Sequence, residues 1–125
     1  MLKNAIFLLA LAYTITLATV CLINLKDLPD TGISFADKIF HFLAYGLFTI
    51  LWYLAFVYSL NFKKIKALFY AFIFAVLFGV IIEILQHTMT ASRALDVYDA
   101  LANTLGALIA SVLIWFKNSL RVKNI

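Results

Sequence analysis

The sequence has few of the residues that form disulfides, interrupt helices or make a protein surface soluble. Its 125 residues include one cysteine, one proline and four glycines, and only 13% of them are charged. The lone cysteine, Cys21, excludes an internal disulfide and a zinc site built from several cysteines. Soluble domains carry about 25% charged residues, so sixteen charged side chains are too few to cover a soluble surface here. The apolar content of 66% also argues against a disordered chain.

Four long apolar runs determine the expected architecture. They cover about residues 5–25, 39–60, 67–85 and 95–116. A helix of about 20 apolar residues crosses the ~30 Å hydrocarbon core, whereas the strands of a membrane barrel are shorter and alternate in polarity. The sequence therefore predicts one domain over residues 1–125, an all-α integral membrane bundle of four transmembrane helices. The first run is long for the apolar region of a signal peptide, so we expect a helix that contains Cys21.

The distribution of lysine and arginine predicts the orientation of the bundle. Seven of the ten lie before the first helix, between the second and third helices, or after the fourth. The other end has three, which are Lys26, Lys38 and Arg93. Cytoplasmic loops are enriched in these residues, so we expect a multi-pass membrane protein with both termini in the cytoplasm. The net charge of +4 is then a basic fringe beside anionic lipids rather than a nucleic-acid-binding surface.

The acidic residues and both histidines lie at the predicted outer ends of the helices, and helical spacing gathers them on a few faces. The groups with this spacing are Asp37, His41 and Tyr45 on the second helix, Glu83 and Gln86 on the third, and Asp96, Asp99 and Asn103 on the fourth. Ionisable and polar groups within a membrane usually face the bundle interior or a wet cavity and are functional candidates. We expect them to converge in one outward-opening site.

A stripe of small residues on the fourth helix predicts close helix packing. Ala102, Gly106 and Ala110 recur every fourth position, which lets a neighbouring backbone approach. We expect Gly106 to contact the third helix near Gly79.

The polar residues also form a recognisable motif. Residues 37–45, DKIFHFLAY, resemble the D-K-x-x-H-F-x-x-Y signature of VanZ-like membrane proteins. Glu83-x-x-Gln86 and then Arg93-x-x-Asp96-x-x-Asp99-x-x-x-Asn103-x-x-Gly106 are similar to the second half of that family. The resemblance runs from Asp37 to about Ala110. Ala110 stands where the family pattern has a glycine, and His87, although it lies within this range, is not one of the motif positions. It implies a role in the response to glycopeptides such as teicoplanin, through a mechanism that is not settled.

The chemistry of these side chains suggests two kinds of role. Carboxylate and histidine groups suit acid–base catalysis, and the candidates are His41, Glu83 and Asp99. The binding candidates are Asp37, Tyr45, Gln86, Arg93, Asp96 and Asn103, of which Arg93 is suited to a phosphate or a carboxylate. We expect no metal or other cofactor, although Asp37/His41 and Glu83/His87 have an acid-x-x-x-His spacing that a zinc or manganese site could use.

The leading interpretation is a cell-envelope membrane protein of the VanZ-like type. Its outward-facing polar cluster would bind or modify a membrane lipid, a lipid-linked cell-wall precursor or another cell-wall component. The alternative is a structural or assembly protein whose polar cluster only locks the helices together. A transporter is disfavoured, because the cytoplasmic half lacks embedded charges for a second gate. Catalysis and simple binding both remain open from the sequence, as does the oligomeric state.

The charge asymmetry makes a prediction about topology. In a Cys21→Ala background, Thr31→Cys and Ser92→Cys should react with a membrane-impermeant maleimide on intact cells or spheroplasts. Asn61→Cys and Asn124→Cys should react only after the membrane is opened. Labelling at residue 61 from outside would reverse the orientation and place the polar cluster on the cytoplasmic face.

Overall fold

A computed structural model of the chain describes residues 2–27, 35–89 and 97–123, and the described residues contain helices and no strands. The helices are α1 (Leu2–Asp27), α2 (Phe35–Leu54), α3 (Lys64–Met89) and α4 (Val97–Lys123), and a π-helical segment, η1 (Ala55–Ser59), continues α2. Each of the four contains a stretch long and apolar enough to cross a membrane, namely Leu2–Leu22, Lys38–Ser59, Lys64–Thr88 and Val97–Leu120. The prediction of an all-α bundle with four membrane-spanning helices is therefore confirmed.

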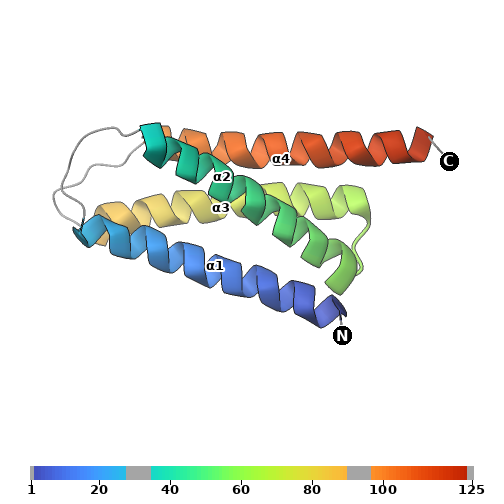
Figure 1. The fold of residues 1–125 in the computed structure, drawn as a ribbon, viewed down its shortest axis with the longest axis horizontal. Helices are drawn as coiled ribbons and strands as arrows, with labels where there is room; N and C mark the ends of the chain where they lie inside the picture. The colour runs from blue at the N-terminus through green and yellow to red at the C-terminus, as the bar shows by residue number, and fades with distance from the viewer. Residues whose placement is uncertain (1, 28–34, 90–96, 124–125) are drawn as a thin grey trace.

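The helices alternate in direction, so both termini lie at one end of the bundle (Figure 1). We call the other end, where α2 and α4 begin, the end opposite the termini. The helices extend several residues beyond most of the predicted apolar runs, because Lys, Asn and Asp at their ends still adopt helical backbone where headgroups and water can solvate them. The predicted start of the fourth helix, residue 95, lies outside the described residues.

The connection between α2 and α3 shows how the sequence ends a helix. Asn61 has a φ of 60°, the left-handed conformation that asparagine tolerates better than most residues. The Phe62 N–H donates to the carbonyl oxygen of Phe56 at 2.9 Å, and the Leu60 N–H donates to that of Ala55 at 3.1 Å. These bonds satisfy carbonyl groups that the end of the helix would otherwise leave open. The chain can therefore turn within four residues and begin α3 at Lys64.

The closest pair of helices is α2 and α4, which cross where both carry glycine. A Cβ atom on Gly106 would overlap the carbonyl oxygen of Phe42 and lie 2.9 Å from its carbonyl carbon. A Cβ on Gly46 would lie 3.4 Å from the carbonyl oxygen of Gly106. Two backbones thus meet directly, the arrangement that small residues permit between membrane helices.

The expectation of a close contact at Gly106 is therefore correct, but the expected neighbour is wrong. Gly106 packs against α2 rather than against α3 near Gly79. A stripe of small residues predicts that the backbone of another helix packs closely against it. Which helix does so depends on which neighbour also has a small residue at the contact. At this level α2 offers Gly46, whereas Gly79 lies against the side chains of Asn103 and Tyr45.

Aromatic rings of α2 and α3 fill the centre of the bundle. Phe48 is fully buried, and its ring lies 4.9 Å from that of Phe78 and 5.2 Å from that of Phe74. Trp52 continues the column one turn further, 5.0 Å from Phe74. Ring pairs at such separations add a favourable quadrupole term to their packing. This column of rings packs α2 against α3 in the part of α2 that follows its crossing with α4.

Helix α1 lies at the edge of the bundle and contacts α2, η1 and α3 among the described residues (Figure 1). Its apolar and polar residues show almost no segregation to one face, which is typical of a helix that mostly faces lipid. Two side-chain hydrogen bonds attach it to α2. The Tyr13 hydroxyl donates to the carbonyl oxygen of Ala44 at 2.6 Å, and the Trp52 Nε1–H donates to Thr14 Oγ1 at 2.8 Å.

The glycine crossing predicts an asymmetric response to two equal substitutions. Gly106→Ala should lower the free energy of unfolding by about 1–3 kcal/mol, because the added methyl group overlaps a backbone carbonyl that cannot move aside. Gly46→Ala, at the same crossing, should be tolerated, since its methyl group meets only an ordinary contact. Equilibrium unfolding of both variants in detergent micelles measures the difference. Equal stabilities would show that the crossing does not depend on the missing Cβ of Gly106.

Candidate functional site

Helix α2 contributes Lys38, His41 and Tyr45 to a polar cluster at the end opposite the termini. The spacing of i, i+3 and i+7 places all three on one helical face. His41 and Tyr45 are buried, with 4% and 0% of their surface exposed, and their rings lie 6.3 Å apart. We call Lys38, His41, Tyr45, Asp99 and Asn103 the polar cluster.

Helix α4 contributes Asp99 and Asn103, one turn apart and both buried. Asp99 lies in the first turn of α4, where the helix dipole favours a carboxylate. Its oxygens face two cationic or polar groups of α2. Lys38 Nζ pairs with Oδ1, and His41 Nε2 lies 3.6 Å from Oδ2. A carboxylate buried among helices therefore has a counter-charge, as membrane burial requires.

The His41 imidazole is held on both sides by α4. Its Nδ1 lies 2.9 Å from Asn103 Oδ1, and because an amide oxygen only accepts hydrogen bonds, Nδ1 is the donor. The other ring nitrogen faces Asp99. Both nitrogens are thus directed at side chains of the protein, which fixes the orientation of the ring.

Helix α3 approaches the polar cluster through Gly79 and Glu83. A Cβ on Gly79 would lie 3.1 Å from Asn103 Nδ2 and 3.2 Å from Tyr45 Cε2, so the absence of a side chain lets these residues pack against the backbone of α3. Glu83, one turn further along, is buried. Three helices therefore meet at Tyr45.

Gln86 of α3, a predicted binding residue, forms a hydrogen bond to α1. Its Nε2 donates to the carbonyl oxygen of Cys21 at 3.0 Å, which ties α3 to α1. A helix carbonyl that already accepts a backbone bond can accept a second one, and this contact adds to the side-chain bonds from Tyr13 and Trp52. Gln86 thus connects α1 to α3 near the end of the bundle that contains the polar cluster.

Two buried polar atoms of the cluster have no hydrogen-bond partner among the described residues. They are the Tyr45 hydroxyl and Asn103 Nδ2. Leaving a buried donor unsatisfied costs about 1–3 kcal/mol, so such atoms usually bond to water or to a ligand. Both can donate to an oxygen acceptor.

The described residues thus bring together most, but not all, of the predicted site. His41 contacts Tyr45, Asp99 and Asn103 across α2 and α4, and Glu83 lies one turn beyond Gly79, where α3 approaches Tyr45. Arg93 and Asp96 lie outside the described residues, and of Asp37 only the backbone, one turn before His41, is described. No three His, Cys, Asp or Glu side chains within residues 2–27, 35–89 and 97–123 form a group that could hold a metal ion.

Lys38 is the residue whose role the sequence underestimated. From the sequence it counts only as one of the three basic residues at that end of the bundle, whereas the structure pairs it directly with Asp99. Its position three residues before His41, on the same helical face, is the signal that could have identified it.

The Lys38–Asp99 pair makes a prediction about stability. Asp99→Leu should lower the free energy of unfolding by about 3 kcal/mol, because it removes a buried carboxylate that pairs with the Lys38 ammonium. The double variant Lys38→Met/Asp99→Leu should lose much less than the sum of the single variants. Val97→Leu, at an exposed position in the same turn, is the control and should have no effect. Additive losses in detergent unfolding would show that the two side chains are not coupled.

Comparison with known proteins places the chain in a family. The family model described as VanZ/LLP1 matches residues 4–118, which is nearly the whole chain. Comparisons with curated proteins and with solved structures give no significant match. The match includes all four apolar helices and every residue of the polar cluster. The chain is therefore a multi-pass membrane protein that belongs to the VanZ/LLP1 family.

Proposed function

We propose that the polar cluster faces the outside of the cytoplasmic membrane and binds the oxygen-rich headgroup of a lipid, a lipid-linked precursor or another cell-wall component. The orientation rests on the excess of lysine and arginine at the end that holds the termini, seven against three. The end opposite the termini then faces the outer leaflet, where such ligands are present.

The observation that carries the proposal is the pair of buried donors without a partner among the described residues, the Tyr45 hydroxyl and Asn103 Nδ2. A cluster that served only to hold helices together would gain nothing from leaving these donors open, because each open donor lowers stability. A phosphate, carbonyl or hydroxyl oxygen of a ligand would satisfy both. The Lys38 ammonium, which pairs with Asp99 on the same end of the bundle, adds positive charge that would favour an anionic group.

The geometry favours binding over catalysis by His41. A general base needs a nitrogen within hydrogen-bond reach of the substrate. Both nitrogens of His41 instead face Asn103 and Asp99, and the ring is almost fully buried. We therefore assign His41 and Asp99 the task of holding Asn103 and Lys38 in place. We assign proton exchange with a bound ligand to Glu83, a buried carboxyl one turn beyond the contact of α3 with Tyr45.

The family resemblance connects this site to antibiotics. Glycopeptides such as teicoplanin act on cell-wall material outside the membrane, so a protein that binds or modifies an outer-leaflet component can change what the antibiotic reaches. We propose this indirect route for any effect of the chain on teicoplanin susceptibility.

Tyr45→Phe tests the proposal without disturbing the fold. The change removes a hydroxyl that has no partner among the described residues, so stability should be unchanged or slightly higher. Binding should be lost, because the ligand loses a donor. Native mass spectrometry of the protein purified from bacterial membranes should show a bound molecule on the wild type and none on the variant. In cells that the protein protects, the inhibitory concentration of teicoplanin should fall to that of cells without it.

Tyr53→Phe is the matched control. The Tyr53 hydroxyl accepts a hydrogen bond from Asn118 Nδ2 at 3.0 Å, near the end that holds the termini. This variant should lose about 1 kcal/mol of stability and keep the bound molecule. If Tyr45→Phe retains the ligand and the cellular effect, the cluster does not bind through that hydroxyl, and the alternative of a purely structural cluster is preferred.

A further inference from the structure

A lipid-facing groove between α1 and α2 lies at the level of the polar cluster. It has a volume of about 390 Å³ and is lined by Leu9, Ala12, Thr16 and Val20 of α1 and by Phe40 and Ala44 of α2, among others. Phe40 and Ala44 flank His41 and Tyr45 in the sequence, so the groove begins where the cluster lies. It has an apolar wall, because the Tyr13 hydroxyl that borders it is bonded to the Ala44 carbonyl oxygen.

The length of the groove matches one leaflet of a bilayer. Leu9 and Val20 are eleven residues apart, which corresponds to roughly 16 Å along a helix. This is about half of the ~30 Å hydrocarbon thickness. Since α1 ends and α2 begins at the end opposite the termini, the groove runs from the polar cluster toward the middle of the membrane.

The groove borders the polar cluster at one side chain. The Phe40 ring, which lines the groove, packs edge-on against the His41 ring at 5.7 Å. A molecule with its headgroup at His41, Asn103 and Tyr45 would therefore have an apolar slot on the adjacent face of α2. We propose that this groove holds a hydrocarbon chain of the ligand whose headgroup the polar cluster binds. The ligand is then a membrane lipid rather than a soluble cell-wall fragment, an assignment that rests on the proposed function.

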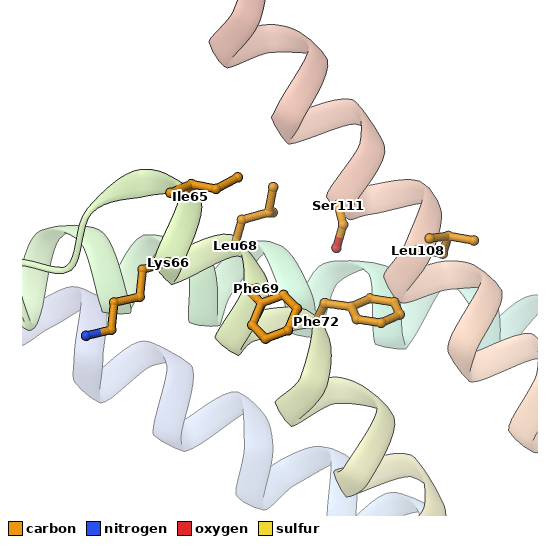
Figure 2. Close-up of a pocket in the computed structure, with 7 residues that line it drawn as sticks. All are labelled: Ile65, Lys66, Leu68, Phe69, Phe72, Leu108 and Ser111. Carbon is orange, nitrogen blue, oxygen red and sulfur yellow. The ribbon is translucent and has the colours of Figure 1, made fainter.

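A second groove provides an internal comparison. It lies between α3 and α4, has a volume of about 460 Å³, and is lined by Ile65, Phe69, Phe72, Leu108 and Ser111 among others (Figure 2). Ser111 is eight residues past Asn103, roughly 12 Å along α4, so this groove lies toward the end that holds the termini. None of its lining residues belongs to the polar cluster or contacts His41 in the way Phe40 does. A lipid there would be held without the cluster.

Filling the first groove tests the inference. Ala12 is exposed and lines the groove, so Ala12→Phe occupies the slot without overpacking the core. Ala5→Phe makes the same change at an exposed position of α1 outside the groove, and Leu108→Phe enlarges a side chain in the second groove. Each variant is delipidated in detergent, mixed with dioleoyl phosphatidylglycerol and analysed by native mass spectrometry. The fraction that retains one lipid should fall severalfold for Ala12→Phe and stay at the wild-type value for the two controls.

Tyr45→Phe in the same assay separates this inference from the proposed function. Loss of the lipid in both Ala12→Phe and Tyr45→Phe supports one ligand that spans cluster and groove. Loss in Tyr45→Phe alone would overturn the groove while leaving the headgroup site in place. Loss in Ala12→Phe alone would show that the groove binds a chain without the cluster, which contradicts the inference. Absence of any retained lipid on the wild type would also overturn it, while the Tyr45→Phe test on protein purified from membranes would still decide the headgroup site.

Discussion

A charged group in hydrocarbon must find its counter-charge within the protein, and for Asp99 that requirement fixes how α4 meets α2. An unpaired carboxylate at membrane depth costs about 2.5–3.5 kcal/mol on insertion scales. Lys38 and His41 face Asp99 and offset that cost, which constrains both the rotation of α2 and its register along α4. Asn103, one turn further along α4, then accepts a hydrogen bond from the other ring nitrogen of His41. The remaining helix contacts follow from this placement.

The first consequence is the glycine crossing. Asp99, Asn103 and Gly106 lie on one stripe of α4, so a helix held by the first two must pass directly over the third. At that point the backbone of α2 comes so close that a methyl group on Gly106 would overlap the Phe42 carbonyl. The polar contacts determine which faces of α2 and α4 meet, and the absence of a side chain on Gly106 lets the two backbones come close. Neither would suffice alone, because lipid tails are as apolar as the helices and no hydrophobic force drives the association.

The second consequence is the shape of the lipid-facing surface. Helix α1 lies at the edge of the bundle, where a few apolar side chains and the hydrogen bonds of Tyr13, Trp52 and Gln86 attach it. A helix held by separated contacts leaves space between them, and the groove beside Phe40 and Ala44 lies in such a space. The cluster itself is not fully satisfied, since Tyr45 and Asn103 keep open donors within the described residues. An amphiphilic ligand would match both features, with its headgroup on the donors and its chain in the groove.

The sequence by itself determined the four helices and the faces on which polar residues lie. Apolar runs of this length have few alternatives to a helix in a membrane, and the 3.6-residue period places His41, Asp99 and Asn103 on helical stripes without further information. Only the tertiary structure decided which stripes meet. The sequence paired Gly106 with α3 and gave no partner for Lys38, whereas the structure places Gly106 on α2 and Lys38 on Asp99. The bond from Gln86 to the backbone of α1 was likewise not evident from the sequence. The reason is that hydropathy cannot distinguish a helix face that meets lipid from one that meets another helix, because both are apolar. Which helix faces meet depends on whether small residues and polar atoms on one helix match those on another.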